Sequence, residues 1–128
     1  MADRKIQAPE INPDSAAFWQ AAREGRFLLR RCTACGEAHW YPRARCPYCL
    51  GEAEWTEASG RGTIYTVSVM RRAPVPYAIA YVMLEEGPAM LTNIVDCDLD
   101  ALAIGQRVRV VFKPSEGDGP PVPMFRPE

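Results

Sequence analysis

The sequence is poor in the residues that most catalytic sites use as bases. Its one histidine, His39, lies between two pairs of cysteines, and nothing around it suggests a Ser-His-Asp or Cys-His arrangement. We interpret His39 as a histidine on the surface of a strand. Glu85 and Glu86 are adjacent, so in an extended strand they point apart and do not form a catalytic carboxylate pair. The sequence therefore predicts no catalytic residue.

A general excess of basic residues and long apolar segments are also missing. The chain has two lysines and a net charge of −1, which gives no overall attraction to nucleic acids or acidic membranes. The longest uncharged stretch of the second half, residues 73–84, is too short to span a bilayer. The first residues lack the apolar run of a secretory signal. We therefore expect a cytoplasmic protein.

Four of the five cysteines form two C-x2-C pairs separated by ten residues: Cys32, Cys35, Cys46 and Cys49. Zn²⁺ is held tetrahedrally by four such ligands, and two residues between the sulfurs let one tight turn supply both. Two disulfides or a redox pair are the alternatives. The doubled motif and the lack of a βαβ context favour zinc. Four thiolates leave no open coordination position, so we expect a structural zinc ion in a zinc ribbon, kept reduced in the cytoplasm.

The two cysteine turns differ in one position. Gly36 follows Cys35, where a turn of this kind favours a positive φ angle. Leu50 takes the matching place after Cys49, so the second turn is either looser or more strained. The fifth cysteine, Cys97, lies between two aspartates that would raise its pKa, and we expect it to be unreactive.

The N-terminal segment predicts one short helix. Residues 1–11 form an extended arm, Asn12 can cap the helix, and Gly25 ends it after about twelve residues. Phe18 and Trp19 lie on or beside one face of this helix. They could pack against the rest of this chain, or they could contact a partner protein or an acyl ligand, and the sequence leaves both alternatives open.

The fold class expected is mainly β, with the helix and a rubredoxin-like zinc ribbon in residues 1–58 and a small OB-fold barrel in residues 59–128. Ser59-Gly60-Arg61-Gly62 marks the boundary. Ribbon strands are predicted at 26–31 and 39–41, and barrel strands at 63–70, 77–84, 89–95, 107–112 and 122–125, with a helical turn at 98–102. The continuous apolar run of residues 77–84 suggests that both faces of that strand are covered.

An OB-type barrel beside a zinc ribbon also occurs in proteins that bind single-stranded nucleic acids. Aromatic side chains and arginines that could serve this purpose are present: Tyr65, Tyr77, Tyr81, Arg71, Arg72, Arg107 and Arg109. Because the barrel region also carries many acidic residues and little lysine, such binding would be weak at cellular salt.

With these elements in order, the sequence resembles the acyl-CoA-associated OB-fold proteins with a rubredoxin-like zinc ribbon, known as domain of unknown function 35. The resemblance covers nearly the whole chain. It includes Phe18-Trp19, Gly25-Arg26-Phe27-Leu28, Arg31-Cys32-x2-Cys35-Gly36, Pro42-Arg43, Cys46-Pro47-x-Cys49, Trp55, Gly60-x-Gly62-Thr63-Ile64-Tyr65, Pro76-Tyr77, Gly105-x2-Val108 and Phe125-Arg126-Pro127. Leu50 and the Gly/Pro-rich loop at 115–123 depart from the pattern.

The resemblance implies a non-catalytic accessory subunit that docks on a thiolase-superfamily enzyme and shapes its acyl-CoA site. A MaoC-like enoyl-CoA hydratase as partner, or a free-standing CoA-binding protein, are alternatives. Residues 23–45 carry six arginines against two glutamates, a local net charge of +4. Arginines suit the phosphates of coenzyme A and the acidic rim of a partner equally well. The predicted partner- or CoA-binding residues are Phe18, Trp19, Arg23, Arg26 and Arg43.

Overall fold

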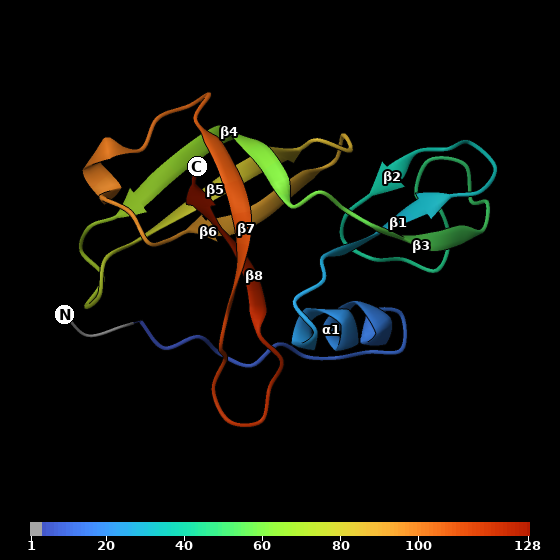
Figure 1. Ribbon diagram of the computed structural model, residues 1–128, viewed down its shortest axis with the longest axis horizontal. Helices are drawn as coiled ribbons and strands as arrows, with labels where there is room; N and C mark the ends of the chain where they lie inside the picture. Colours follow the sequence, from blue (N-terminus) through green and yellow to red (C-terminus); the bar gives the residue numbers. More distant parts are fainter. Residues whose placement is uncertain (1–3) are drawn as a thin grey trace.

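A computed structural model describes residues 4–128. It contains one α-helix, a small three-stranded sheet and a closed five-stranded barrel (Figure 1). The sheet and the barrel lie side by side, and the helix lies below the sheet in this view. The predicted mainly β architecture is confirmed. Among residues 4–128, no helix has both the length and the apolar character needed to cross a membrane.

The small sheet is the ribbon, in the order β2-β1-β3. Strand β1 (Leu28–Cys32) pairs antiparallel with β2 (Ala38–His39) and with β3 (Ala53–Glu57). The predicted return strand 39–41 is shorter than expected, because regular pairing ends at His39. Strand β3 was not predicted, since its sequence Ala-Glu-Trp-Thr-Glu contains two acidic residues and gives a weak strand signal.

Helix α1 (Ala16–Arg23) is shorter than the predicted twelve residues. The chain turns between Asn12 and Ser15, and Ser15 takes the N-cap position that was predicted for Asn12. Asn12 still stabilises this start, because its Oδ1 accepts a hydrogen bond of 3.0 Å from the amide of Ser15. Gly25 follows the helix with φ of +76°, as its role as a terminator requires.

The barrel closes in the order β4-β5-β6-β8-β7. Its strands are β4 (Arg61–Met70), β5 (Tyr77–Leu84), β6 (Ala89–Ile94), β7 (Arg107–Lys113) and β8 (Val122–Pro127). The short 3-10 helix η1 (Leu99–Ala101) precedes β7, and the carboxylate of Asp98 caps it by accepting from the amide of Asp100 at 3.0 Å. All five predicted barrel strands are present, together with the predicted helical turn.

The hydrophobic core is continuous from the helix through the ribbon strand into the barrel. Phe18 of α1 is fully buried and makes edge-on aromatic contacts with Trp19, Phe27 and Trp40. Phe27 in turn packs against Phe125 of β8, with ring centroids 6.2 Å apart. β3 ends at Glu57 and β4 begins at Arg61, close to the predicted division at residue 58. Apolar packing nevertheless spans this division.

Strand β5 corrects one expectation. Its alternate residues Ala78, Ala80, Val82 and Leu84 face the barrel interior and are buried. The other face is open, with Tyr81 47% and Met83 39% exposed. The run of apolar residues therefore does not mark a strand covered on both faces along its whole length. On the outer side Tyr77 is half-buried with Arg4 over its ring, whereas Tyr81 and Met83 are exposed.

Candidate functional site

The four predicted metal ligands converge on one point between the two cysteine turns. The Sγ atoms of Cys32, Cys35, Cys46 and Cys49 all lie within 4.8 Å of one another. Two of the pairs that join the turns, Cys32–Cys49 and Cys35–Cys46, are separated by 3.4 Å and 3.7 Å. Thiolates at about 2.3 Å from a tetrahedral zinc ion lie about 3.8 Å apart, so the arrangement fits zinc.

The sulfur positions do not fit the alternatives. All five cysteines are free, and the separations above are far longer than the disulfide bond of about 2.05 Å. Sulfur atoms of both turns lie together in one group, so the cluster is a shared four-sulfur site rather than two separate pairs. Four thiolates fill all the coordination positions of a tetrahedral metal ion, and such a site stabilises a fold.

Two backbone amides of the first turn donate hydrogen bonds to a cysteine sulfur and so stabilise its thiolate form. The amides of Ala34 and Cys35 each donate to the Sγ of Cys32 at 3.3 Å. The amide of Cys35 has the largest effect, and together these donors lower the pKa of the Cys32 thiol to about 6 against the opposing effect of burial. A lowered pKa favours the thiolate form of Cys32, which is the form that binds a metal.

Gly51 lies so close to the sulfur cluster that a side chain would displace its neighbours, which the sequence did not reveal. A Cβ atom at this position would lie 3.1 Å from the Sγ of Cys32, 3.1 Å from the Cβ of Ala34 and 3.3 Å from the Sγ of Cys49. The residue thus lies directly against the sulfur cluster. The glycine immediately after Leu50 was the available signal, but only the folded second turn shows what it contacts.

His39 was predicted to lie on the surface, and this prediction is wrong. Its side chain on β2 is buried, with 2% exposed, and its Nε2 accepts a hydrogen bond of 3.3 Å from the amide of Arg43. Burial lowers the pKa of His39, and the nearby charges of Arg30 and Arg43 act in the same direction. His39 therefore supports the start of the loop between β2 and the second cysteine turn as a neutral side chain.

Phe18 and Trp19 face inward. Phe18 has no exposed surface and Trp19 is 6% exposed, and the indole Nε1 of Trp19 donates to the hydroxyl of Tyr41 at 3.2 Å. Of the two alternatives left by the sequence, the structure shows packing inside this chain. Neither ring is exposed, as direct contact with a partner or acyl group would require. A helix this short is stable only when such rings are packed against other elements.

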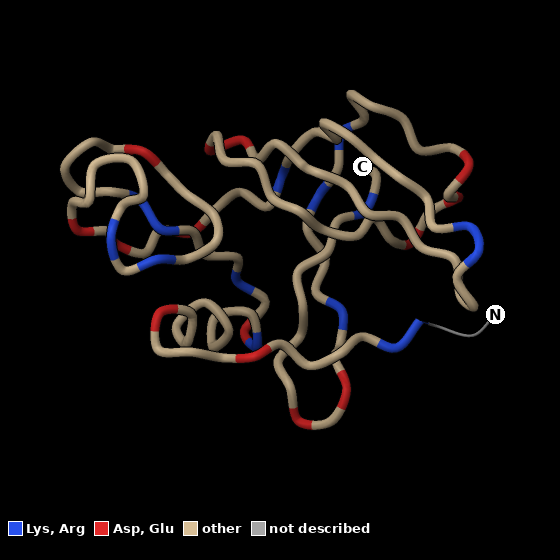
Figure 2. The backbone as a smooth tube through the Cα atoms, turned by 180° about the vertical axis from the view of Figure 1, so that it is seen from behind, with Lys and Arg blue, Asp and Glu red and all other residues tan. Residues whose placement is uncertain are grey.

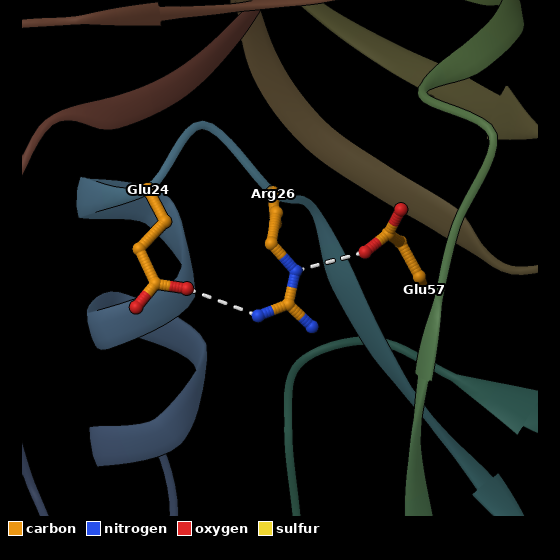
Figure 3. Close-up of polar contacts among 3 residues, drawn as sticks. All are labelled: Glu24, Arg26 and Glu57. Carbon is orange, nitrogen blue, oxygen red and sulfur yellow. Dashed lines mark hydrogen bonds and ion pairs between the residues drawn. The ribbon is translucent and has the colours of Figure 1, made fainter.

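The three predicted arginines are exposed, and two of them are held by contacts within the chain. Figure 2 shows basic positions on the ribbon and near the helix, and a second group on the barrel. Arg23 donates to the carbonyl of Asp118 at 2.9 Å. Arg26 bridges the helix end and β3, because it pairs with Glu24 at 3.0 Å and Glu57 at 2.9 Å (Figure 3). These carboxylates, Glu57 foremost, raise the pKa of Arg26.

Arg43 differs from the other two arginines. Its side chain forms no ion pair within residues 4–128, and only its backbone amide is used, by His39. Arg43 is therefore the most available of the predicted arginines, and binding by all three stays a prediction.

The features that suggested nucleic-acid binding are dispersed. Arg4 lies over the ring of Tyr77 at 3.8 Å, and Arg71 forms an ion pair with Asp100. Tyr65 and Tyr81 are exposed, at 62% and 47%. Cys97 is half-buried, and burial, followed by Asp96 and Asp98, raises the pKa of its thiol, in line with the expectation that it is unreactive.

Comparison with known proteins gives the same two parts in the same order. Residues 19–56 match the rubredoxin-like zinc ribbon domain of ChsH2, and residues 55–113 match the C-terminal OB-fold domain of ChsH2. A solved structure described as "Ltp2-ChsH2(DUF35) aldolase" is similar, with a TM-score of 0.81 and 33% identity, covering 93% of this chain and 98% of that one.

Two curated relatives differ in length. A "DUF35 domain-containing scaffold protein" of Methanocaldococcus jannaschii is 37% identical over 110 residues, which cover 79% of this chain and 78% of that protein. A "Probable enoyl-CoA hydratase alpha subunit" of Thermomonospora curvata is 36% identical over 126 residues. These residues are 93% of this chain but 39% of that protein. The chain, with its four-cysteine ribbon and closed barrel, belongs to the DUF35 family.

Proposed function

We propose that this chain is a non-catalytic accessory subunit of an acyl-CoA-processing complex. It would dock on a thiolase-superfamily enzyme and shape or complete the acyl-CoA site of that enzyme, with an acyl-CoA as a shared ligand, in the cytoplasm. The observation that carries this proposal is the likeness of 93% of this chain to 98% of a chain in the structure described as "Ltp2-ChsH2(DUF35) aldolase". The name "scaffold protein" of the Methanocaldococcus jannaschii relative supports it further.

The chemistry of the chain agrees with a supporting role. The one histidine is buried and hydrogen-bonded to backbone, and the cysteine away from the cluster has a raised pKa. The other four cysteines form a closed set of metal ligands, in which a zinc ion would stabilise the ribbon without an open position for substrate. A nucleophile and base for thioester chemistry would then come from the partner enzyme.

A second candidate partner is an enoyl-CoA hydratase of the MaoC-like kind. Two relatives are named as alpha subunits of hydratases, one for enoyl-CoA and one for 3-oxo-4,17-pregnadiene-20-carboxyl-CoA. This chain spans less than two fifths of each in length. In both proposals this chain is a subunit of an enzyme that acts on an acyl-CoA thioester. The proposals differ in whether that enzyme is a thiolase or a hydratase.

Co-purification from the native host separates these proposals. A tagged chain should retain a thiolase-type enzyme through gel filtration, identified by mass spectrometry. Retention of a hydratase instead would support the second candidate. A chain that elutes alone, or with nucleic acid, would contradict the proposed function.

A further inference from the structure

Three arginines stand in a row across neighbouring strands on the outside of the barrel. Arg61 of β4 is paired in register with Arg109 of β7, and Arg109 is paired with Arg126 of β8. The residues beside the first two, Gly62 and Val108, are buried, so by the alternation of strands Arg61 and Arg109 point outward and are exposed, whereas Arg126 is half-buried. Figure 2 shows basic positions side by side on adjacent strands of the barrel. We call Arg61, Arg109 and Arg126 the arginine row.

The arginine row has no anionic partner of its own. Within residues 4–128, none of its three guanidinium groups forms an ion pair, whereas the neighbouring Arg107 lies 3.6 Å from Glu128. The Nε of Arg126 is buried and has no hydrogen-bond partner among these residues. Like charges directly opposite each other on paired strands destabilise a sheet, and an unpaired buried donor destabilises it further. Such an arrangement indicates a site completed by another molecule.

An apolar patch adjoins the row on the same outer surface. Thr63 of β4 is paired with Arg107 on one side and with Met83 on the other, so the basic and apolar regions meet at this strand. Beyond it, Tyr81 of β5 lies opposite Leu91 of β6. The exposed members of the patch are Tyr65 (62%), Leu91 (55%), Tyr81 (47%) and Met83 (39%).

The shape and composition of this surface favour a protein as the occupant. Small ligands bind in concave sites, and two grooves of the described residues are lined by other segments, around 69–77 and 93–100. The patch and row lie on the convex outside of a closed barrel. Aromatic residues, methionine and arginine are the types enriched in protein interfaces.

We propose that the outer face formed by the arginine row and the patch of Tyr65, Tyr81, Met83 and Leu91 is the docking surface for the partner enzyme. The complementary surface of that enzyme has an apolar centre bordered by carboxylates, which pair with the guanidinium groups of the row, those of the exposed Arg61 and Arg109 foremost. This inference rests on the proposed accessory function and adds the face that is used and the chemistry that it meets.

The test compares two glutamine variants in the co-purified complex. Arg61→Gln with Arg109→Gln removes two charges of the row. Arg72→Gln, an exposed arginine of the β4–β5 loop, is the matched control. The double variant should bind the isolated enzyme about tenfold more weakly or worse, with a reduced dependence on salt. It should unfold at the same or a higher denaturant concentration than the native chain, because repulsion is relieved. The control should bind normally.

Hydrogen exchange on the complex provides a second readout that needs no variant. The amides of residues 61–66, 79–83 and 107–111 should exchange more slowly when the enzyme is bound. Equal binding by the double variant, with these amides unprotected, would overturn the inference and leave the proposed function in place. Failure of any enzyme to co-purify would overturn both. Binding of an oligothymidine at physiological salt that the double variant loses would assign the row to nucleic acid and also overturn the inference.

Discussion

Leu50 occupies in the second cysteine turn the position that Gly36 occupies in the first. Both have positive φ angles, of 65° and 79°. The amide of each donates to the carbonyl of the first cysteine of its turn, Gly36 to Cys32 at 3.1 Å and Leu50 to Cys46 at 2.9 Å. The sequence left open whether the second turn is looser or more strained than the first. It is the more strained turn, because leucine disfavours the left-handed conformation.

Replacing Leu50 with glycine should stabilise the metal-bound protein. Leu50 is 75% exposed, so little packing is lost, and relief of the left-handed strain outweighs the extra freedom of glycine in the unfolded chain. We expect a gain of about 0.5 kcal/mol in the free energy of unfolding. Gly36→Ala should lose about 1 kcal/mol. Guanidinium denaturation would measure both, and a destabilising Leu50→Gly would show that the turn is not strained.

Replacing Cys32 or Cys46 with serine should release the metal and unfold the ribbon. Each is a buried ligand of the four-sulfur cluster, and a ribbon of this size depends on its metal for folding. Metal analysis and circular dichroism would report the loss. Cys97→Ser is the matched control, since Cys97 lies outside the cluster, and it should keep both metal and fold. Full metal content in the Cys32→Ser variant would contradict the assigned ligands.

Truncating Phe18 should destabilise the free chain rather than weaken docking directly. The ring is fully buried among Trp19, Phe27 and Trp40. Phe18→Ala should therefore cost about 3–5 kcal/mol in unfolding free energy. The exposed Ile104→Ala should change it by less than about 0.5 kcal/mol. A Phe18→Ala chain of native stability that no longer binds the enzyme would place this ring in the interface instead.

Acidification should destabilise the fold in part through His39. Because burial lowers its pKa in the folded state, the unfolded chain binds the proton more readily. Stability is complete above the unfolded pKa of about 6.5 and falls as the pH drops from there towards the lower folded value. Comparing denaturation midpoints across this range, His39→Gln should show a shallower decline than the native chain. Parallel declines in both proteins would show that His39 does not contribute.

Local signals were strong enough to predict most of the architecture. The cysteine spacing gave the ligand set. Alternation of apolar and polar residues, and apolar runs between turns, gave the barrel strands within one or two residues of their observed ends. Asp98 was recognised as a cap because this role depends on neighbouring residues alone.

Features that depend on distant contacts could not be predicted. His39 is buried on β2, which pairs with β1, and the local pattern around His39 does not show this burial. Phe18 is buried because Phe27 and Trp40 converge on it. The sequence also did not reveal the arginine row. Arg61, Arg109 and Arg126 are far apart in the sequence, and only the register of three strands places them side by side.

Thioester turnover by the purified components tests the central claim most directly. The co-purified enzyme and this chain would be assayed with an acyl-CoA substrate separately and together. We expect no turnover by this chain alone and a higher rate when it is added to the enzyme than for the enzyme alone. Turnover of the thioester by this chain in the absence of any partner would contradict the account.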